Sequence, residues 1–267
     1  MVRVEFIGLP GSGKSYLRKM LVRRLQLVDN KKYVTSEEAF FEVSRRKMDK
    51  VYRHAINILP VYFAMKLIHK LINRSLMQFD AQNSFLAKWG MVLEIFLSSP
   101  GFKKMSIEER KVVIAGFIET GSIFECLNFD SFQKRIIFYE EGFVQKSFMF
   151  ISPRVDCNIN NALVLDYLDY IPHTDILIYV NTGIAECYDR MLNRKEGVTN
   201  RLKNSNREDI MNFLGRANEH LKEIVSWVKK KDDIHLIEIN NELEPKRAIS
   251  ELEGQIVNLT WGNNEIL

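Results

Sequence analysis

GLPGSGKS, residues Gly8 to Ser15, is the stretch of sequence that decides the fold. It fits the pattern G-x-x-x-x-G-K-[ST], in which glycines let the backbone curl so that successive N–H groups point inward at phosphate oxygens. The six residues before it, VRVEFI, indicate a short strand. The residues after it predict a helix with one buried apolar stripe, formed by Leu17, Met20, Leu21, Leu25 and Val28. A strand, a glycine-rich loop and a helix are the context that a phosphate-binding loop requires. The first part of the chain therefore predicts a binding site for nucleotide phosphates.

The residue types in this loop indicate how a nucleoside triphosphate would bind. Lys14 can reach the β- and γ-phosphates as a point charge, and the Ser15 hydroxyl suits Mg²⁺. The N-terminus of the following helix adds partial positive charge facing the phosphates. We predict that the nucleotide contacts the whole loop, formed by Gly8, Leu9, Pro10, Gly11, Ser12, Gly13, Lys14, Ser15 and Tyr16.

Strands alternate with helices over much of the chain, which predicts an α/β fold with a parallel sheet covered on both faces. The expected strands are residues 2–7, 32–35, 135–139, 175–180 and 234–239. Capping-box patterns predict helix starts at residues 35–38, 106–109 and 205–208. In such folds ligands bind at the carboxyl ends of the strands.

Residues 41–134 do not follow this alternation. They place 94 residues between the second and third expected strands, which is too long for a plain loop in a compact domain. The segment is rich in Leu, Ile, Phe and Met. We expect a helical insertion that serves as a lid or substrate subdomain within a single domain spanning residues 1–267.

The composition excludes several classes of protein. The 267 residues are 46% hydrophobic and 27% charged, with 13 Gly, 6 Pro and 3 Cys, which excludes disorder, collagen and a disulfide scaffold. The longest uncharged apolar stretch in the middle of the chain, residues 55–65, has 11 residues, whereas a membrane span needs about 20. The first residues show no secretion-signal pattern, and the cysteines form no CxxC pair. We expect a cytoplasmic protein.

Positive charge is concentrated in one segment. Residues 43–79 carry eight Lys or Arg against one Asp, although the whole chain has a net charge of only +4. This segment fits a solvated helix face, a wall facing an anionic substrate, or a membrane-surface or nucleic-acid patch. Because the net charge of the chain is weak, no nucleic-acid partner is expected, and a peripheral membrane contact through residues 45–74 stays open.

Three stretches together resemble the P-loop kinases of the nucleoside and nucleotide kinase type, and also adenylate-kinase-like AAA-type ATPase domains. They are GLPGSGKS at residues 8–15, RIIFYEEGFVQ at residues 135–145 and CYDRMLNRKEGVTNRL at residues 187–202. The resemblance implies a three-layer P-loop NTPase fold, with a five-stranded parallel sheet in the order 2-3-1-4-5. It also implies ATP, or another nucleoside triphosphate, and Mg²⁺ as ligands.

The same resemblance implies roles for side chains outside the loop. Glu140 matches the family's acid at the end of the third strand and would hold Mg²⁺, as would Ser15. Glu37 and Glu38 lie where nucleoside kinases place the carboxylate that accepts the substrate hydroxyl proton. Because Glu38 completes a capping box, Glu37 is the better candidate for the base. Three arginines are candidates for a lid that contacts nucleotide phosphate: Arg190, Arg194 and Arg201.

Two of these arginines are four residues apart, so Arg190 and Arg194 are expected to share one helical face. Planar guanidinium groups suit the negative charge on the transferred phosphoryl oxygens. Lys14, Glu37 and Arg194 are therefore the predicted catalytic residues.

Three functions agree with this pattern. The favoured one is a kinase that phosphorylates a nucleoside, a nucleotide or a sugar. The second is a nucleotide-dependent regulatory ATPase or switch, in which the helical insertion contacts a partner. The third is a binding protein that kept the loop and lost catalysis. A GTPase is disfavoured because the Asn-Lys-x-Asp pattern is missing, and a transporter ATPase because no LSGGQ-like sequence appears.

Overall fold

A five-stranded, all-parallel sheet forms the centre of the computed structural model, which describes residues 1–47, 76–128, 134–151, 161–194, 197–198, 202–203, 205–242 and 245–261. The strands lie in the order β2-β3-β1-β4-β5. Their bounds are β1 Val2–Ile7, β2 Tyr33–Thr35, β3 Ile136–Tyr139, β4 Ile176–Asn181 and β5 His235–Asn240. The predicted fold class and strand order are confirmed, and each strand boundary lies within one residue of its predicted place.

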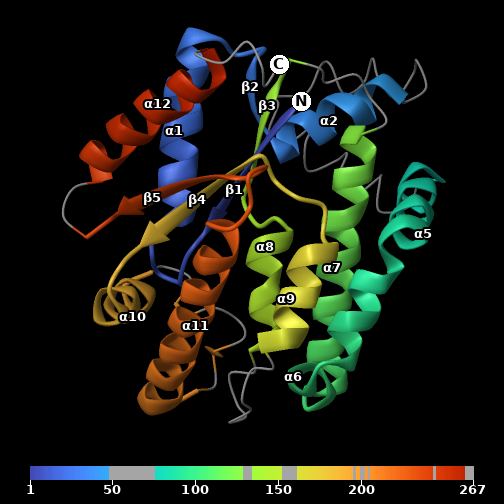
Figure 1. The fold of residues 1–267 in the computed structure, drawn as a ribbon, viewed down its shortest axis with the longest axis vertical. Helices are drawn as coiled ribbons and strands as arrows, with labels where there is room; N and C mark the ends of the chain where they lie inside the picture. The colour runs from blue at the N-terminus through green and yellow to red at the C-terminus, as the bar shows by residue number, and fades with distance from the viewer. Residues whose placement is uncertain are drawn as a thin grey trace.

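Helices cover both faces of this sheet (Figure 1). They are α1 Lys14–Val28, α2 Ser36–Lys47, α5 Leu76–Ser98, α6 Pro100–Lys103, α7 Ile107–Asn128, α8 Phe143–Lys146, α9 Asn161–Tyr170, α10 Ile184–Leu192, α11 Arg207–Val228 and α12 Pro245–Trp261, with a 3₁₀ turn at Ser147–Phe150. Helices α1 and α12 pack on one face, where Leu21 and Leu252 meet alternate residues of β1 such as Val4. A larger apolar core on the other face includes α7, α9 and α11. The result is the three-layer arrangement expected of the fold.

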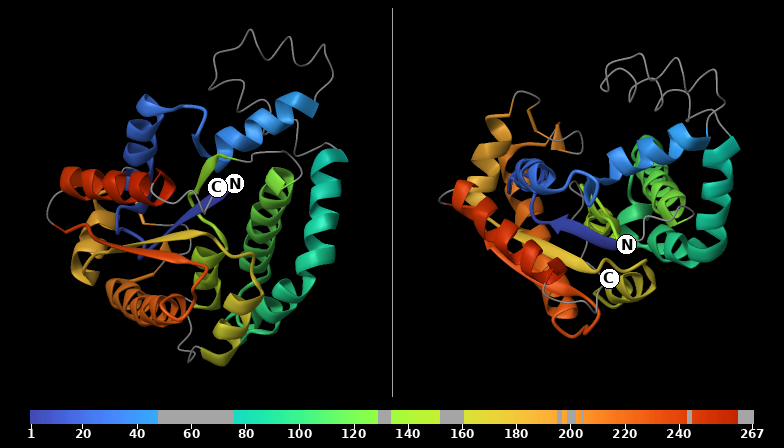
Figure 2. Two further views of the ribbon diagram at one scale, coloured as in Figure 1. Left: turned by 45° about the horizontal axis from the view of Figure 1, so that its top comes forward. Right: turned by 90° about the horizontal axis from the view of Figure 1, so that it is seen from above.

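Two long helices, α5 and α7, lie side by side at one edge of the molecule, between β2 and β3 in the chain (Figure 2). Aromatic contacts join them to the main core. The Phe85 ring of α5 is stacked on Phe143 of α8 and tilted against Phe117 of α7, with both centroid distances 5.6 Å. Such aromatic pairs contribute stability beyond their buried area. These helices are therefore continuous with the core, and the role of residues 41–134 as a lid or substrate subdomain stays a prediction.

Three local predictions are wrong. Val28 was expected on the buried stripe of α1, but it ends the helix and is 68% exposed. Helix α10 ends at Leu192, so Arg190 and Arg194 do not share one helical face. Helix α11 is capped by Asn206 and not by Ser205, because the Asn206 side chain accepts a hydrogen bond from Asp209 N at 2.8 Å. Asn is at least as good an N-cap as Ser, so the start moves by one residue.

The basic segment predicted as a patch, residues 45–74, falls outside the described residues apart from its first three. Within the ranges that the structure describes, no helix combines the length and apolar character needed to cross a bilayer.

Candidate active site

All strands are parallel, so the residues that follow them meet at one edge of the sheet. The GLPGSGKS loop follows β1, and Glu37 lies just after β2. Glu140 follows β3, Thr182 follows β4 and Asn241 follows β5. The topology thus gathers residues from distant parts of the sequence at this edge, and the loop, Glu37 and Glu140 among them were predicted.

The loop depends on glycine at two positions. Gly11 and Gly13 both have a φ of +89°, in the left-handed region that favours glycine. A Cβ atom on Gly11 would lie 2.2 Å from Cys187 O, and one on Gly13 would lie 2.4 Å from Asn241 Nδ2. Any side chain at either position would therefore meet both backbone strain and an overlap.

The ends of β4 and β5 hold the loop through its Ser12 carbonyl. This oxygen accepts hydrogen bonds from Asn241 Nδ2 at 2.7 Å and from Thr182 Oγ1 at 3.2 Å. The Arg190 guanidinium donates to Asn241 O at 2.9 Å, and this hydrogen bond keeps the Arg190 side chain close to Gly13. Asn241 and Thr182 are functional-site residues that the sequence analysis missed, since only their position after a strand could have indicated them.

Lys14 lies across the loop with its ammonium partly buried. Its Nζ donates to Gly8 O at 2.6 Å and to Leu9 O at 3.0 Å. Burial lowers the pKa of Lys14 to about 8, and the nearby charge of Arg194 lowers it further, whereas Glu141 acts in the opposite direction. A desolvated ammonium that donates to neutral carbonyl oxygens gains from an anionic partner, because hydrogen bonds between oppositely charged groups are stronger.

The remaining loop and lid residues have different environments. The Ser12 hydroxyl is buried without a hydrogen-bond partner among the described residues. Ser15 and Tyr16, in the first turn of α1, are exposed to solvent. Arg194 is exposed just beyond α10, and Arg201 lies outside the described residues.

Arg18 joins the two predicted acids. It lies one helical turn after Lys14, and its Nη1 contacts the two carboxylate oxygens of Glu37 at 3.1 and 3.3 Å. Its Nη2 donates to Glu140 Oε2 at 2.6 Å. The Arg18 side chain is 11% exposed, so these pairs are partly shielded from water. Arg18 could not be singled out from the sequence, because its four-residue spacing from Lys14 predicts only that the two side chains share a helix face.

Glu38, the other acid after β2, closes the start of α2. Its carboxylate accepts from Thr35 N at 2.9 Å, and its own N–H donates to Thr35 Oγ1 at 3.1 Å. This reciprocal pair is the predicted capping box and is confirmed. The Glu38 carboxylate is thus hydrogen-bonded to the backbone at the start of α2, whereas the carboxylate of the neighbouring Glu37 contacts Arg18.

Two adjoining cavities lie beside the loop. The first, which we call the acid-lined cavity, has a volume of about 250 Å³ and is lined by Ser36, Glu37, Gly116, Glu119, Thr120, Ile123, Tyr139, Glu140, Glu141 and Lys146. The second, which we call the loop-side cavity, has a volume of about 320 Å³ and includes Pro10 and Gln145. Both are lined by Gly116, Glu141 and Lys146. They therefore form one cleft from the phosphate-binding loop to α7.

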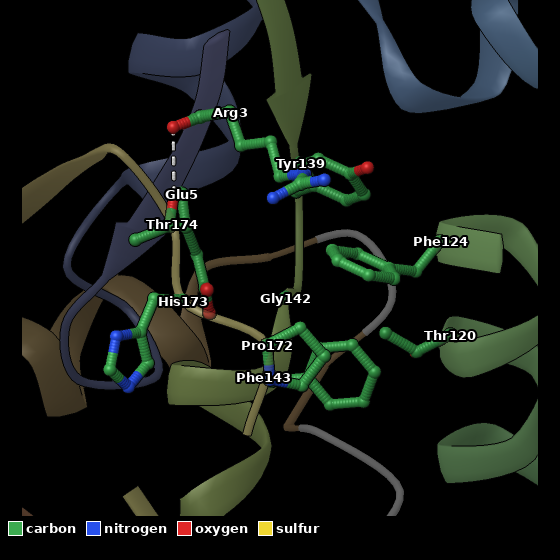
Figure 3. Close-up of a pocket in the computed structure, with 10 residues that line it drawn as sticks. All are labelled: Arg3, Glu5, Thr120, Phe124, Tyr139, Gly142, Phe143, Pro172, His173 and Thr174. Carbon is green, nitrogen blue, oxygen red and sulfur yellow. Dashed lines mark hydrogen bonds between the residues drawn. The ribbon is translucent and has the colours of Figure 1, made fainter. Parts of the chain in front are cut away.

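A buried acid connects this cleft to the loop. Glu5 of β1 accepts from Gln145 N at 2.7 Å, and Gln145 Oε1 accepts from Gly8 N at 3.1 Å. Figure 3 shows the Glu5 carboxyl group beside Gly142, where a Cβ atom would lie 2.3 Å from Glu5 Cδ. Burial raises the pKa of Glu5 to about 7. The segment after β3 is thus tied both to β1 and to the first N–H of the loop.

Comparison with known proteins adds little to this geometry. No family model matches the chain, and no curated protein sequence matches it. Among solved structures, thymidylate kinase from Ehrlichia chaffeensis is similar at 15% identity, with a TM-score of 0.40, over 96% of this chain and 98% of that chain. Because that similarity is low, the assignment of the fold rests on the phosphate-binding loop and on the order of the strands. These give the chain a P-loop kinase-like fold.

Proposed function

We propose that this protein is an ATP- and Mg²⁺-dependent kinase that transfers a phosphoryl group to a hydroxyl of a small molecule. The observation that carries the proposal is the cleft that runs from the phosphate-binding loop to a pair of carboxylates. Lys14 lies at the loop end of the cleft. At the opposite end, Glu37 and Glu140 both form ion pairs with Arg18. Phosphoryl transfer needs little more than such positioning and charge neutralisation.

The loop residues fit a bound triphosphate. Gly11 and Gly13 have left-handed conformations, Lys14 offers a desolvated ammonium, and the Ser12 hydroxyl lacks a partner among the described residues. We propose that residues Gly8 to Tyr16 bind the phosphates, helped by Arg190, Arg194 and Arg201. Bound ATP with Mg²⁺ would supply the electrophilic phosphorus and neutralise charge on the phosphoryl oxygens.

Ser15 and Glu140 are the proposed protein ligands of Mg²⁺. In the part of the chain that the structure describes, no three His, Cys, Asp or Glu side chains converge on a metal site. Mg²⁺ at a kinase site is commonly held by one or two protein groups together with phosphate oxygens and water. Two protein ligands are therefore enough.

Glu37 is the proposed base. It would accept the proton of the acceptor hydroxyl as the acceptor oxygen bonds to the γ-phosphorus and the bond from that phosphorus to the leaving ADP oxygen breaks. Arg18 would act as a positioning residue, because it fixes the Glu37 carboxylate. Helix α7, which lines the cleft, would help to exclude water, whose attack on ATP is the competing reaction.

The decisive experiment is to incubate the purified chain with γ-labelled ATP, Mg²⁺ and a panel of hydroxylated metabolites. We expect label to appear in a new acceptor in step with ADP release. If ATP is hydrolysed at a rate that no acceptor increases, the result would instead favour a regulatory ATPase. Absence of ATP binding in calorimetry would overturn both functions.

The Glu37 assignment has a matched control in its neighbour. Glu37→Gln should slow phosphoryl transfer by about 10² or more, because an amide cannot accept the proton. Glu38→Gln should leave the rate near normal, since Gln also serves in a capping box. Equal rates for the two variants would move the role of base to another carboxylate.

A further inference from the structure

Gln145 places its side-chain amide between the phosphate-binding loop and the loop-side cavity. It lies in α8, is half-buried and lines this cavity together with Pro10 of the loop. Its Oε1 atom accepts a hydrogen bond from Gly8 N at 3.1 Å. Because a backbone N–H can only donate, this contact identifies the amide oxygen, and the NH₂ group lies on the other side of the amide.

The NH₂ group of Gln145 carries two hydrogen-bond donors. No hydrogen bond joins its Nε2 to any residue that the structure describes, and these residues do not enclose it. The cavity that Gln145 lines has a volume of about 320 Å³, far larger than the roughly 30 Å³ of a water molecule. A ligand group in this cavity can therefore accept a hydrogen bond from Gln145.

The surroundings of Gln145 hold its amide in place. Its main-chain N–H donates to the buried Glu5 carboxyl group at 2.7 Å, which anchors α8 to β1. The contact with Gly8 N anchors the side chain. A donor that is fixed before the ligand arrives loses little freedom on binding, so its hydrogen bond is worth more.

The residue of the loop that holds Gln145 also holds the Lys14 ammonium. Lys14 Nζ donates to Gly8 O at 2.6 Å, and Gly8 N donates to Gln145. The amide and the ammonium therefore lie at one residue of the loop, where Lys14 is the proposed partner of the β- and γ-phosphates. Lys146, which also lines the loop-side cavity, is already paired with Glu141 at 3.1 Å.

We propose that Gln145 is a further catalytic residue, whose NH₂ group donates to an oxygen of the γ-phosphate and keeps this contact while the phosphoryl group is transferred. The transferred group carries negative charge on three oxygens, and one lysine cannot contact them all. This inference rests on the proposed kinase function, and it adds the side chain that distinguishes a bound triphosphate from a diphosphate.

The test compares two nucleotides in two variants. Calorimetry at pH 8 would measure the Kd of Mg²⁺-ADP and of Mg²⁺ with β,γ-imido-ATP, which has a γ-phosphate and resists hydrolysis. Gln145→Glu keeps an acceptor for Gly8 N but adds a charge, since a carboxylate is ionised at this pH. Gln145→Met has a similar length and adds no charge, but it releases Gly8 N. Only the loss of the donor is common to both variants.

In both variants we expect the affinity for β,γ-imido-ATP to fall about 10- to 100-fold more than the affinity for ADP, because hydrogen bonds to charged groups are the stronger ones. Gln255→Met is the matched control, since Gln255 lies on α12 and donates to Glu251 one helical turn away. It should leave both affinities unchanged. Circular dichroism checks that each variant is folded.

Two outcomes would overturn the inference. Equal losses for the two nucleotides in Gln145→Met would show that Gln145 only holds the loop. A selective loss in Gln145→Glu alone would show that repulsion by the new carboxylate is the cause. In either case the unmodified chain still binds nucleotide and the proposed function stands. An unmodified chain that binds neither nucleotide overturns the proposed function, and this inference with it.

Discussion

The two ends of the cleft are built from different parts of the polypeptide. At the phosphate end, main-chain geometry makes the site: left-handed glycines, and a Ser12 carbonyl held by Asn241 and Thr182. At the acceptor end, side chains from α2, α7 and the end of β3 make it, and Arg18 gathers two of them. A main-chain site is encoded in a few consecutive residues and leaves little room for change. A side-chain site is assembled from distant residues and adapts more readily.

The largest effect is expected at the phosphate end. Lys14→Ala should lower kcat/KM by about 10³ or more, because the ammonium that would neutralise the β- and γ-phosphates is removed. Steady-state kinetics and Mg²⁺-ATP calorimetry measure it, and circular dichroism checks that the fold is kept. Lys19→Ala is the matched control, since Lys19 lies on the same helix and is exposed. Retained turnover in Lys14→Ala would remove this residue from the mechanism.

Two glycine substitutions compare the ends directly. Gly13→Ala should weaken Mg²⁺-ATP binding by about 10², because the left-handed backbone disfavours alanine and its Cβ would lie 2.4 Å from Asn241 Nδ2. Gly116→Ala, in the middle of α7, meets only Lys146 Nζ at 3.8 Å. It should raise the free energy of unfolding by about 0.5–1 kcal/mol, since alanine is the better helix former.

Gly116 lines both cavities, so its substitution should raise the KM for the acceptor and leave nucleotide binding unchanged. Calorimetry with Mg²⁺-ATP and thermal unfolding of both variants measure the difference. If Gly13→Ala binds nucleotide as well as the unmodified chain does, the loop is not the rigid element that the comparison requires.

Arg18 holds the acceptor end from α1, one helical turn after Lys14, and an intermediate effect is expected there. Arg18→Gln should lower kcat by about 10- to 100-fold with less change in the KM for ATP, because Glu37 and Glu140 lose the cation that positions them. Arg24→Gln is the control, as Arg24 pairs with Glu253 on the far side of α1. A structural role alone would lower stability and leave kcat per folded molecule unchanged, which kinetics corrected for the folded fraction would detect.

The glycine-rich loop and the order of the strands could be predicted before the structure, whereas the side-chain contacts that hold each end of the cleft could not. The loop and the Glu38 cap follow from local patterns of four to eight residues, and the strand order follows from the resemblance to P-loop kinases. Arg18, Asn241 and Gln145 carry no such pattern, because their roles come from neighbours that lie far away in the sequence. The error in the end of α10 has the same origin: four-residue spacing indicates one face only where the helix continues.

An effect on stability alone is expected at Glu5, which ties the segment after β3 to the loop through Gln145. Burial raises the pKa of Glu5 from 4.5 to about 7, so the folded chain binds more protons than the unfolded chain between these values. The stabilisation is therefore complete below pH 4.5 and is lost as the pH rises through 7, by on the order of 1–3 kcal/mol. Glu5→Gln keeps an acceptor for Gln145 N and should flatten this dependence. Urea unfolding at pH 5, 6, 7 and 8 measures both curves, and equal slopes for the two proteins would show that Glu5 is ionised throughout.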